Sequence, residues 1–265
     1  SLKNINKCMA KIKDTQALTN DTGAPINQNA GFQYEIDLIK RLRDQGFRTG
    51  DPAGADNAKA DLELYLPSQT SPIKFELKEK LSADFAQLNM DFDTTLKQFY
   101  IDKTKSSNTK EAAMTMIGIA EEFNIIGKTN DQWKPKETPP AKFTLPPTAG
   151  LQQRKDAYQL DLARFKDFFL AKGGSLAAEQ VEKYYNSKST YYIQIKGKGL
   201  YYLGSDPMNF GVPRFSSMVG DSSIRIRIKA NSKSQARYSF LMALKIGRLR
   251  ASSYDLDRDP LFLIK

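Results

Sequence analysis

The amino-acid sequence predicts an α/β protein built on a mixed β-sheet with helices on both sides. Two segments, 62–66 and 73–78, alternate apolar and polar residues, as strands with one buried face do. A helical period of apolar residues precedes them at 31–45, and helices and strands continue to alternate in the second half of the chain. This alternation favours a sheet that is covered by helices.

The two alternating segments are expected to pair as a hairpin. Pro67 and Pro72 bound the connection between them, and with the Ser and Thr residues in between they predict a turn. If both apolar faces lie on the core, several charged side chains share the opposite face: Asp61, Glu63, Glu76 and Lys78. Carboxylates and an ammonium group on rigid strands are what a metal-dependent hydrolase of phosphodiesters requires.

The chain divides into four parts along its length. They are an N-terminal extension (1–30), a core (31–133), a proline-rich linker or surface loop (134–150) and a basic C-terminal part (151–265). The last part is an α+β elaboration that either completes the same sheet or forms a separate lobe. The other expected elements are helices at 4–18, 111–122, 151–172 and 176–185, a short helix capped by Ser82, a hairpin at 190–203 and a strand at 223–229.

Positive charge is concentrated in one stretch of the chain. Residues 181–250 contain 13 Lys and Arg against three acids, which accounts for the whole formal charge of +10. A one-sided basic segment on a neutral body is typical of a protein that binds a polyanion. The alternative is a basic face that is simply solvated.

The lack of histidine narrows the chemistry. It excludes imidazole-based zinc sites and every nucleophile that histidine activates. Hydrolysis by this chain would therefore depend on carboxylates, lysine and a hard metal ion. Cys8 is the single cysteine, which predicts a reducing, cytoplasmic setting, and no apolar run approaches the roughly 20 residues of a membrane span.

Over residues 31–100 the sequence resembles the PD-(D/E)XK nuclease superfamily, which has the restriction-endonuclease-like fold. The matching residues are Asp61 in KADLEL, Glu76, Leu77 and Lys78 in KFELK, and Glu35 in GFQYE. Ala60 stands where the motif's name has proline, a position at which the superfamily varies. The resemblance implies a mixed sheet flanked by helices and Mg²⁺-dependent cleavage of DNA, as in a restriction-type endonuclease.

Each matching residue has a physical role in this interpretation. Asp61 and Glu76 supply hard oxygen ligands for Mg²⁺, and Mn²⁺ is expected to substitute for it. Lys78, two residues from Glu76, orients the attacking water and stabilises the transition-state charge. Glu35 is a further ligand, directly or through water, and the resemblance implies the Leu77 carbonyl as another.

Several alternatives remain open from the sequence. One alternative is that the charged face of the hairpin is a solvated sheet surface. Another is that the chain is a catalytically silent DNA-binding module that keeps the fold and the basic face. Within the enzyme interpretation, a structure-specific or end-processing nuclease competes with a restriction-type enzyme. A cutter of both strands needs two copies of the site, which predicts a homodimer on duplex DNA. Gln87 contacts the metal-bound water or the DNA backbone, or is an ordinary surface residue.

A second set of residues is expected to hold DNA. In SIRIRIK the side chains of Arg225, Arg227 and Lys229 share one face, about 6.5 Å apart, close to the per-strand phosphate repeat of roughly 7 Å. The candidates that extend this row are Lys233 and Arg237, together with Lys196 and Lys198 beside the tyrosine-rich hairpin. The rival interpretation is an edge strand that is protected by its charges.

Overall fold

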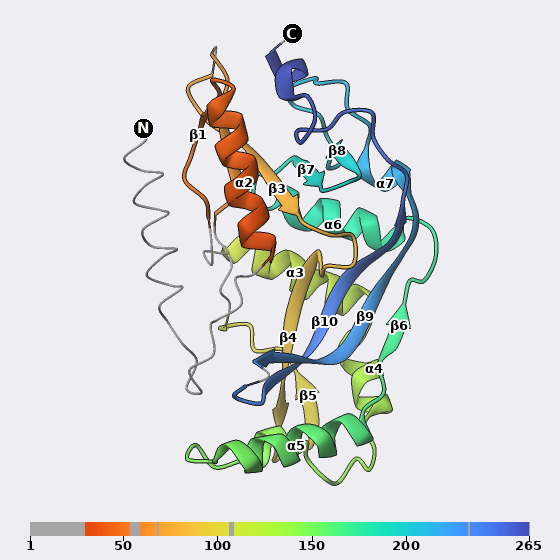
Figure 1. Ribbon diagram of the computed structural model, residues 1–265. Helices are drawn as coiled ribbons and strands as arrows, with labels where there is room; N and C mark the ends of the chain where they lie inside the picture. Colours follow the sequence, from red (N-terminus) through yellow and green to blue (C-terminus); the bar gives the residue numbers. More distant parts are fainter. Residues whose placement is uncertain (1–29, 54–58, 68, 106–108, 233, 265) are drawn as a thin grey trace.

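The computed structural model describes residues 30–53, 59–67, 69–105, 109–232 and 234–264. The helix expected at 4–18 therefore lies outside the described residues. Two five-stranded sheets form the frame of the molecule (Figure 1). Helices pack against both of them, which confirms the predicted α/β class.

Sheet 1 has the strand order β1-β2-β3-β7-β8. Its strands are β1 (Arg48–Thr49), β2 (Leu62–Tyr65), β3 (Ile73–Lys78), β7 (Tyr192–Ile195) and β8 (Gly199–Tyr202). The β3 and β7 strands run parallel and the other neighbours run antiparallel, so the sheet is mixed as predicted. The hairpin from the C-terminal part thus continues the sheet that the first hairpin begins.

Sheet 2 has the order β5-β4-β10-β9-β6 and is antiparallel throughout. Its strands are β5 (Gln98–Tyr100), β4 (Ala86–Asp93), β10 (Arg237–Leu249), β9 (Val219–Ser232) and β6 (Phe168–Leu170). The pairing of β4 with β10 brings residues from before and after the proline-rich segment into one sheet.

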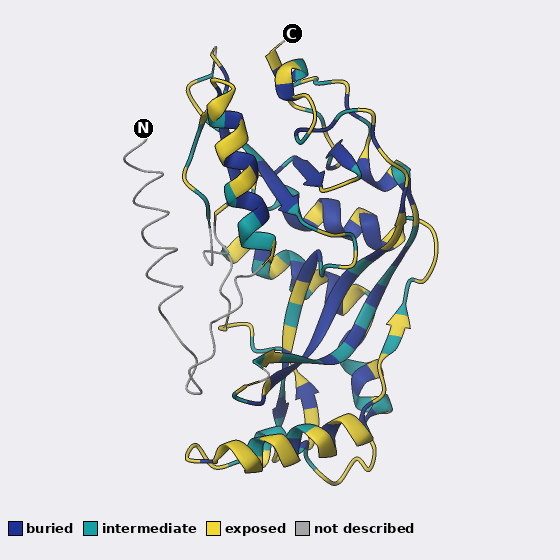
Figure 2. Cartoon of the chain, in the orientation of Figure 1, coloured by how far each residue is buried: buried dark blue, intermediate teal, exposed yellow. Residues whose placement is uncertain are grey.

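The helices lie along these sheets. They are α2 (Ala30–Asp44), α3 (Lys110–Glu122), α4 (Ile125–Gln132), α5 (Leu151–Arg164), α6 (Leu176–Asn186) and α7 (Phe215–Met218), with short 3-10 turns η1 (Ala141–Thr144) and η2 (Pro260–Ile264). The α2 helix packs its apolar side chains on one face of sheet 1, where Tyr192 belongs to the same core cluster. On the other face, Ile193 and Ile195 share the main core with α6 and the inner face of sheet 2. Figure 2 shows the resulting stripes of buried residues along α2 and the strands.

One predicted helix is wrong and another is shorter than expected, because long-range strand pairing prevails over local pattern. The segment after Ser82 forms strand β4, whose Met90 and Phe92 point into the main core. The helix expected at 151–172 ends at Arg164. Phe165 is then buried in an extended conformation, and β6 pairs with β9.

The proline-rich segment is held against α5. The backbone N–H groups of Ala141 and Lys142 donate hydrogen bonds to the Asp161 carboxylate at 2.7 and 3.0 Å. Asp161 is fully buried and also accepts a hydrogen bond from the Tyr238 hydroxyl of β10 at 2.6 Å. These contacts fix residues 141–142 to the body of the protein.

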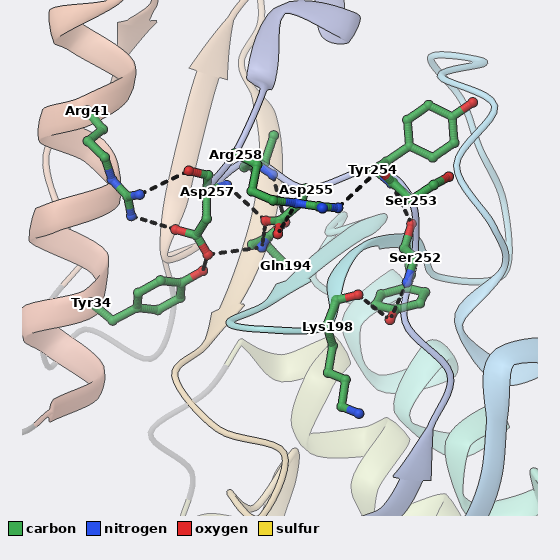
Figure 3. Close-up of polar contacts among 12 residues, drawn as sticks. Tyr34, Arg41, Gln194, Lys198, Ser252, Ser253, Tyr254, Asp255, Asp257 and Arg258 are labelled. Atoms are coloured by element: carbon green, nitrogen blue, oxygen red, sulfur yellow. Dashed lines mark hydrogen bonds and ion pairs between the residues drawn. The ribbon is translucent and has the colours of Figure 1, made fainter.

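The C-terminal segment fastens α2 to sheet 1 (Figure 3). Tyr34 donates a hydrogen bond to Asp257 at 2.8 Å, and Arg41 forms an ion pair with the same carboxylate at 2.5 Å. Gln194 of β7 donates hydrogen bonds to Asp255 at 2.8 Å and to Asp257 at 3.3 Å. Asp257 thus joins three parts of the chain, one of which is the helix that carries Glu35.

Every helix in the part of the chain that the structure describes is too short or too polar to cross a membrane.

Candidate active site

Three of the predicted residues meet at the end of the first hairpin. The antiparallel register pairs Leu62 with Phe75, and its continuation by one residue puts Asp61 opposite Glu76. The Leu77 N–H donates a hydrogen bond to Asp61 Oδ2 at 2.9 Å, and Lys78 forms an ion pair with Glu76 Oε1. The alternation of the two strands therefore produces the predicted cluster.

The cluster opens into a pocket of about 680 Å³. Asp61, Glu76 and Lys78 line one part of it, and Glu35 of α2 lines it as well. Glu63 lies outside this lining, and its backbone carbonyl accepts a hydrogen bond from the Gly50 N–H at 2.8 Å. The pocket thus includes the Asp61 carboxylate but not that of Glu63, which the sequence places on the same face of the hairpin.

Charges in the cluster perturb one another. Burial and the nearby Glu76 carboxylate raise the pKa of Asp61 to about 7, against the opposing effects of Lys78 and the Leu77 N–H. Burial acts to lower the pKa of Lys78, but the carboxylates of Glu76 and Asp61 outweigh it and raise that pKa. Lys78 therefore stays protonated at neutral pH, and negative charge is crowded around Asp61.

The donor set suits a hard divalent cation. Asp61 and Glu76 offer carboxylate oxygens, and a cation between them would relieve the repulsion that raises the pKa of Asp61. The Leu77 N–H points toward Asp61, beyond the end of β2. Because the N–H and C=O of one strand residue point to the same side, the Leu77 carbonyl faces the same space.

Glu35 stands apart from the two carboxylates. Among the described residues, no three Asp, Glu or Cys side chains come close enough to form a metal-ligating group. Glu35 is buried and shares the pocket with Asp61 and Glu76, but it does not complete a three-carboxylate set with them. A role through water is compatible with this placement.

Helix α6 and the turn that follows it add two residues that sequence reasoning missed. The Tyr185 hydroxyl donates a hydrogen bond to Glu76 Oε1 at 2.8 Å and also lies beside the Phe85 carbonyl. Burial and the charge of Glu76 raise the pKa of Tyr185 well above its usual value, so the hydroxyl keeps its proton. Lys188, just after the helix, lines the pocket and acts to lower the pKa of Asp61. No local signal marks either residue, since more than 100 positions separate Tyr185 from Glu76.

The predicted row on β9 has the expected alternation, but its cations already contact carboxylates. Arg225 forms an ion pair with Asp167. Arg227 and Lys229 reach Asp84 at 2.7 and 3.0 Å, and the side chain of Asp84 is only 4% exposed.

Lys245 of β10 also contacts Asp84, at 3.0 Å. Asp84 and Lys245 were not anticipated, because the loop and the strand that bring them together are distant in sequence. The resulting basic cluster consists of Arg227, Lys229 and Lys245 around Asp84.

The edge-strand interpretation of β9 is wrong where β6 pairs with it. Residues Phe168–Leu170 pair with Ile224–Ile226 on one side of β9, and β10 pairs along the other side. Charge on this stretch is therefore not needed to block sheet-to-sheet pairing.

The remaining DNA-binding candidates are dispersed. Arg237 is exposed at the start of β10, and Lys233 lies outside the described residues. The Lys196 side chain lies 5.5 Å from the ring of Tyr34, and its backbone N–H donates to the Lys78 carbonyl at 2.9 Å. The Lys198 carbonyl accepts a hydrogen bond from Tyr201 at 2.8 Å. The structure does not gather these residues into the basic cluster on sheet 2.

Comparisons with known proteins add little to this geometry. No protein-family model and no curated protein matches the sequence. Among solved structures, the chain is similar to an HhaI endonuclease in complex with DNA, at 10% identity and a TM-score of 0.33. The match covers 83% of this chain and 87% of that one. The function proposed below therefore rests on the pocket itself.

Proposed function

We propose that this chain is a Mg²⁺-dependent deoxyribonuclease of the PD-(D/E)XK type that hydrolyses phosphodiester bonds in DNA. The observation that carries the proposal is the meeting of Asp61, Glu76 and Lys78 at one wall of a large pocket. Two carboxylates and a protonated lysine are the groups that metal-assisted phosphodiester hydrolysis needs in a protein without histidine.

In this proposal Asp61, Glu76 and the Leu77 carbonyl hold the metal ion. Mg²⁺, or Mn²⁺ in its place, would supply the chemistry of a hard Lewis acid at this site by activating water and offsetting charge on the phosphate oxygens. Lys78 donates a hydrogen bond to a phosphate oxygen or to the attacking water, because its raised pKa keeps it an ammonium. Tyr185 holds Glu76 in place through Oε1.

The experiment is cleavage of plasmid and linear DNA with Mg²⁺ or Mn²⁺. Asp61→Ala and Lys78→Ala should each abolish cleavage, whereas Glu63→Ala and Lys74→Ala should retain it. The two control residues face each other in the same hairpin but do not line the pocket, so they report any general damage to the strands. Cleavage that survives in both Asp61→Ala and Lys78→Ala would place the active site elsewhere.

A silent DNA-binding module is the competing outcome. It predicts DNA binding by the parent protein with no cleavage in either metal on any of several substrates. If cleavage occurs, mapping the cut sites separates a restriction-type enzyme, which cuts at a fixed sequence, from a structure-specific or end-processing one. Sedimentation with duplex DNA tests the proposed homodimer.

A further inference from the structure

The polar face of sheet 2 combines amides with cations. In β4, Met90 and Phe92 point into the main core, and the alternate residues Gln87 and Asn89 are exposed. In β9, Ile226 points into the same core and Arg225 and Arg227 are on the opposite face. The helices α3 and α6 cover the core side of this sheet.

Strand register sets the spacing between the two kinds of side chain. Gln87 lies opposite Ala243 of β10, which in turn lies opposite Arg225 of β9. Asn89 is related in the same way, through Leu241, to Arg227. Two inter-strand steps of about 4.8 Å separate each amide from its cation by about 10 Å.

This face continues into the candidate active site. Gln87 and Asn89 line the same pocket as Asp61, Glu76 and Lys78. A DNA strand whose phosphate lies at the carboxylates therefore passes next to β4. The first argument for a DNA-docking face is therefore that one pocket extends from Asp61, Glu76 and Lys78 to the exposed side chains of Gln87 and Asn89.

The charge of the face is the second argument. Among the described residues, the cations Arg225, Arg227, Lys229 and Lys245 form ion pairs with two carboxylates, those of Asp84 and Asp167. Burial lowers the pKa of Lys245, and Arg227 and Arg225 lower it further although Asp84 acts in the opposite direction. The excess of positive charge complements a phosphodiester backbone.

The amides themselves are suited to reading bases. Gln87 donates a hydrogen bond to Asp84 at 2.9 Å, which orients its side chain and leaves its carbonyl oxygen available. Within the described residues, the side-chain amide of Asn89 makes no hydrogen bond. Gln and Asn bind adenine through paired hydrogen bonds to N6 and N7 in the major groove.

We propose that Gln87 and Asn89 read adenines in duplex DNA, while the β9 and β10 cations hold the adjacent backbone. The inference rests on the proposed function, because DNA is the occupant that the active site requires. Residues i and i+2 of a strand are about 6.8 Å apart, which matches two base-pair steps of about 3.4 Å. The two adenines should therefore be separated by one base pair.

The test is a binding selection from a random-sequence duplex pool, with Asp61→Ala as the parent so that no DNA is cut. We expect enrichment of two adenines one base pair apart. Gln87→Ala should relax one of these positions and Asn89→Ala the other, each by roughly 5- to 150-fold in discrimination. Affinity for non-specific DNA and its salt dependence should not change.

The matched control is Gln152→Ala. Gln152 is also exposed and donates a hydrogen bond to a carboxylate, Asp156, but it lies on α5 outside the pocket. Thermal melts confirm folding of every variant. A sequence preference that both Gln87→Ala and Asn89→Ala leave intact overturns the inference.

Four further outcomes are decisive. Binding without any preference, or binding only to single strands, also overturns the inference. If the selection succeeds but the unsubstituted protein cuts no DNA in Mg²⁺ or Mn²⁺, base reading stands and the proposed nuclease function fails. If no duplex DNA is bound at all, the inference is wrong whatever the chemistry of the pocket.

Discussion

At the scale of single residues, burial of the Asp61 carboxylate beside Glu76 has a cost in stability. Its pKa in the folded protein is about 7, against an ordinary value of 3.8, because it is buried beside Glu76. Folding therefore favours the protonated form. The metal-free protein should lose stability as the pH rises from about 4 to 7, with the full loss present above pH 7.

Asp61→Asn should accordingly stabilise the metal-free protein while abolishing cleavage. The amide keeps an acceptor for the Leu77 N–H but removes the charge. We expect a gain of about 1–3 kcal/mol in the free energy of unfolding at pH 8, and none below pH 4. Urea denaturation in chelator at a series of pH values measures it. A gain that is independent of pH would show that ionisation of Asp61 is not its source.

Tyr185 is the second prediction at this scale. Tyr185→Phe removes the hydrogen bond to Glu76 Oε1 but keeps the buried ring. Because groups that orient metal ligands typically contribute 10- to 100-fold, we expect about a tenfold higher Mg²⁺ concentration for half-maximal cleavage, with unchanged DNA affinity. Tyr158→Phe on α5, outside the pocket, is the control. An unchanged metal requirement would leave Tyr185 with a packing role alone.

At the scale of elements, β9 carries cations on one face and core isoleucines on the other. Arg225→Ala combined with Arg227→Ala should weaken binding to all DNA sequences. Loss of two phosphate contacts should reduce the slope of log affinity against log salt by up to about two. Fluorescence anisotropy over a range of salt concentrations measures both quantities.

The control for this pair is Arg248→Ala with Arg250→Ala, which removes equal charge near the C-terminal end of β10 and just after it, outside the pocket lining. If the two double variants have the same affinity and salt slope, the effect is one of net charge and not of β9. Because Arg227 also contacts Asp84, the stability of the first variant must be measured alongside its binding.

At the scale of the whole molecule, Asp257 joins α2, β7 and the C-terminal segment. Asp257→Ala removes the acceptor for Tyr34 and Arg41, and we expect a loss of about 2–4 kcal/mol in the free energy of unfolding. Hydrogen exchange should accelerate in α2, and cleavage should fall because this helix carries Glu35. Asp259→Ala, at an exposed carboxylate two residues further on, is the control. Equal losses of stability in both variants would show that the contacts of Asp257 with Tyr34 and Arg41 have no specific stabilising effect.

The local sequence pattern was sufficient to predict which side chains share one face of a strand or helix. Alternation placed Asp61, Glu76 and Lys78 on one face because strand side chains alternate regardless of the rest of the fold. The same rule correctly separated the cations and isoleucines of β9. The α2 helix and the hairpin at 190–203 also follow from local periodicity and from glycine in the turn.

The sequence by itself therefore determined the α/β class, the mixed sheet and six residues that line the pocket: Glu35, Asp61, Glu76, Leu77, Lys78 and Gln87. Only the tertiary structure decided that Tyr185 supports Glu76, that Asp84 neutralises part of the β9 row, and that Glu35 stands apart from the two carboxylates. It also decided that the segments at 86–93 and 168–170 are strands. The physical reason is that these features depend on pairing and burial between distant segments, and this free energy exceeds the small local preferences that a sequence pattern reports.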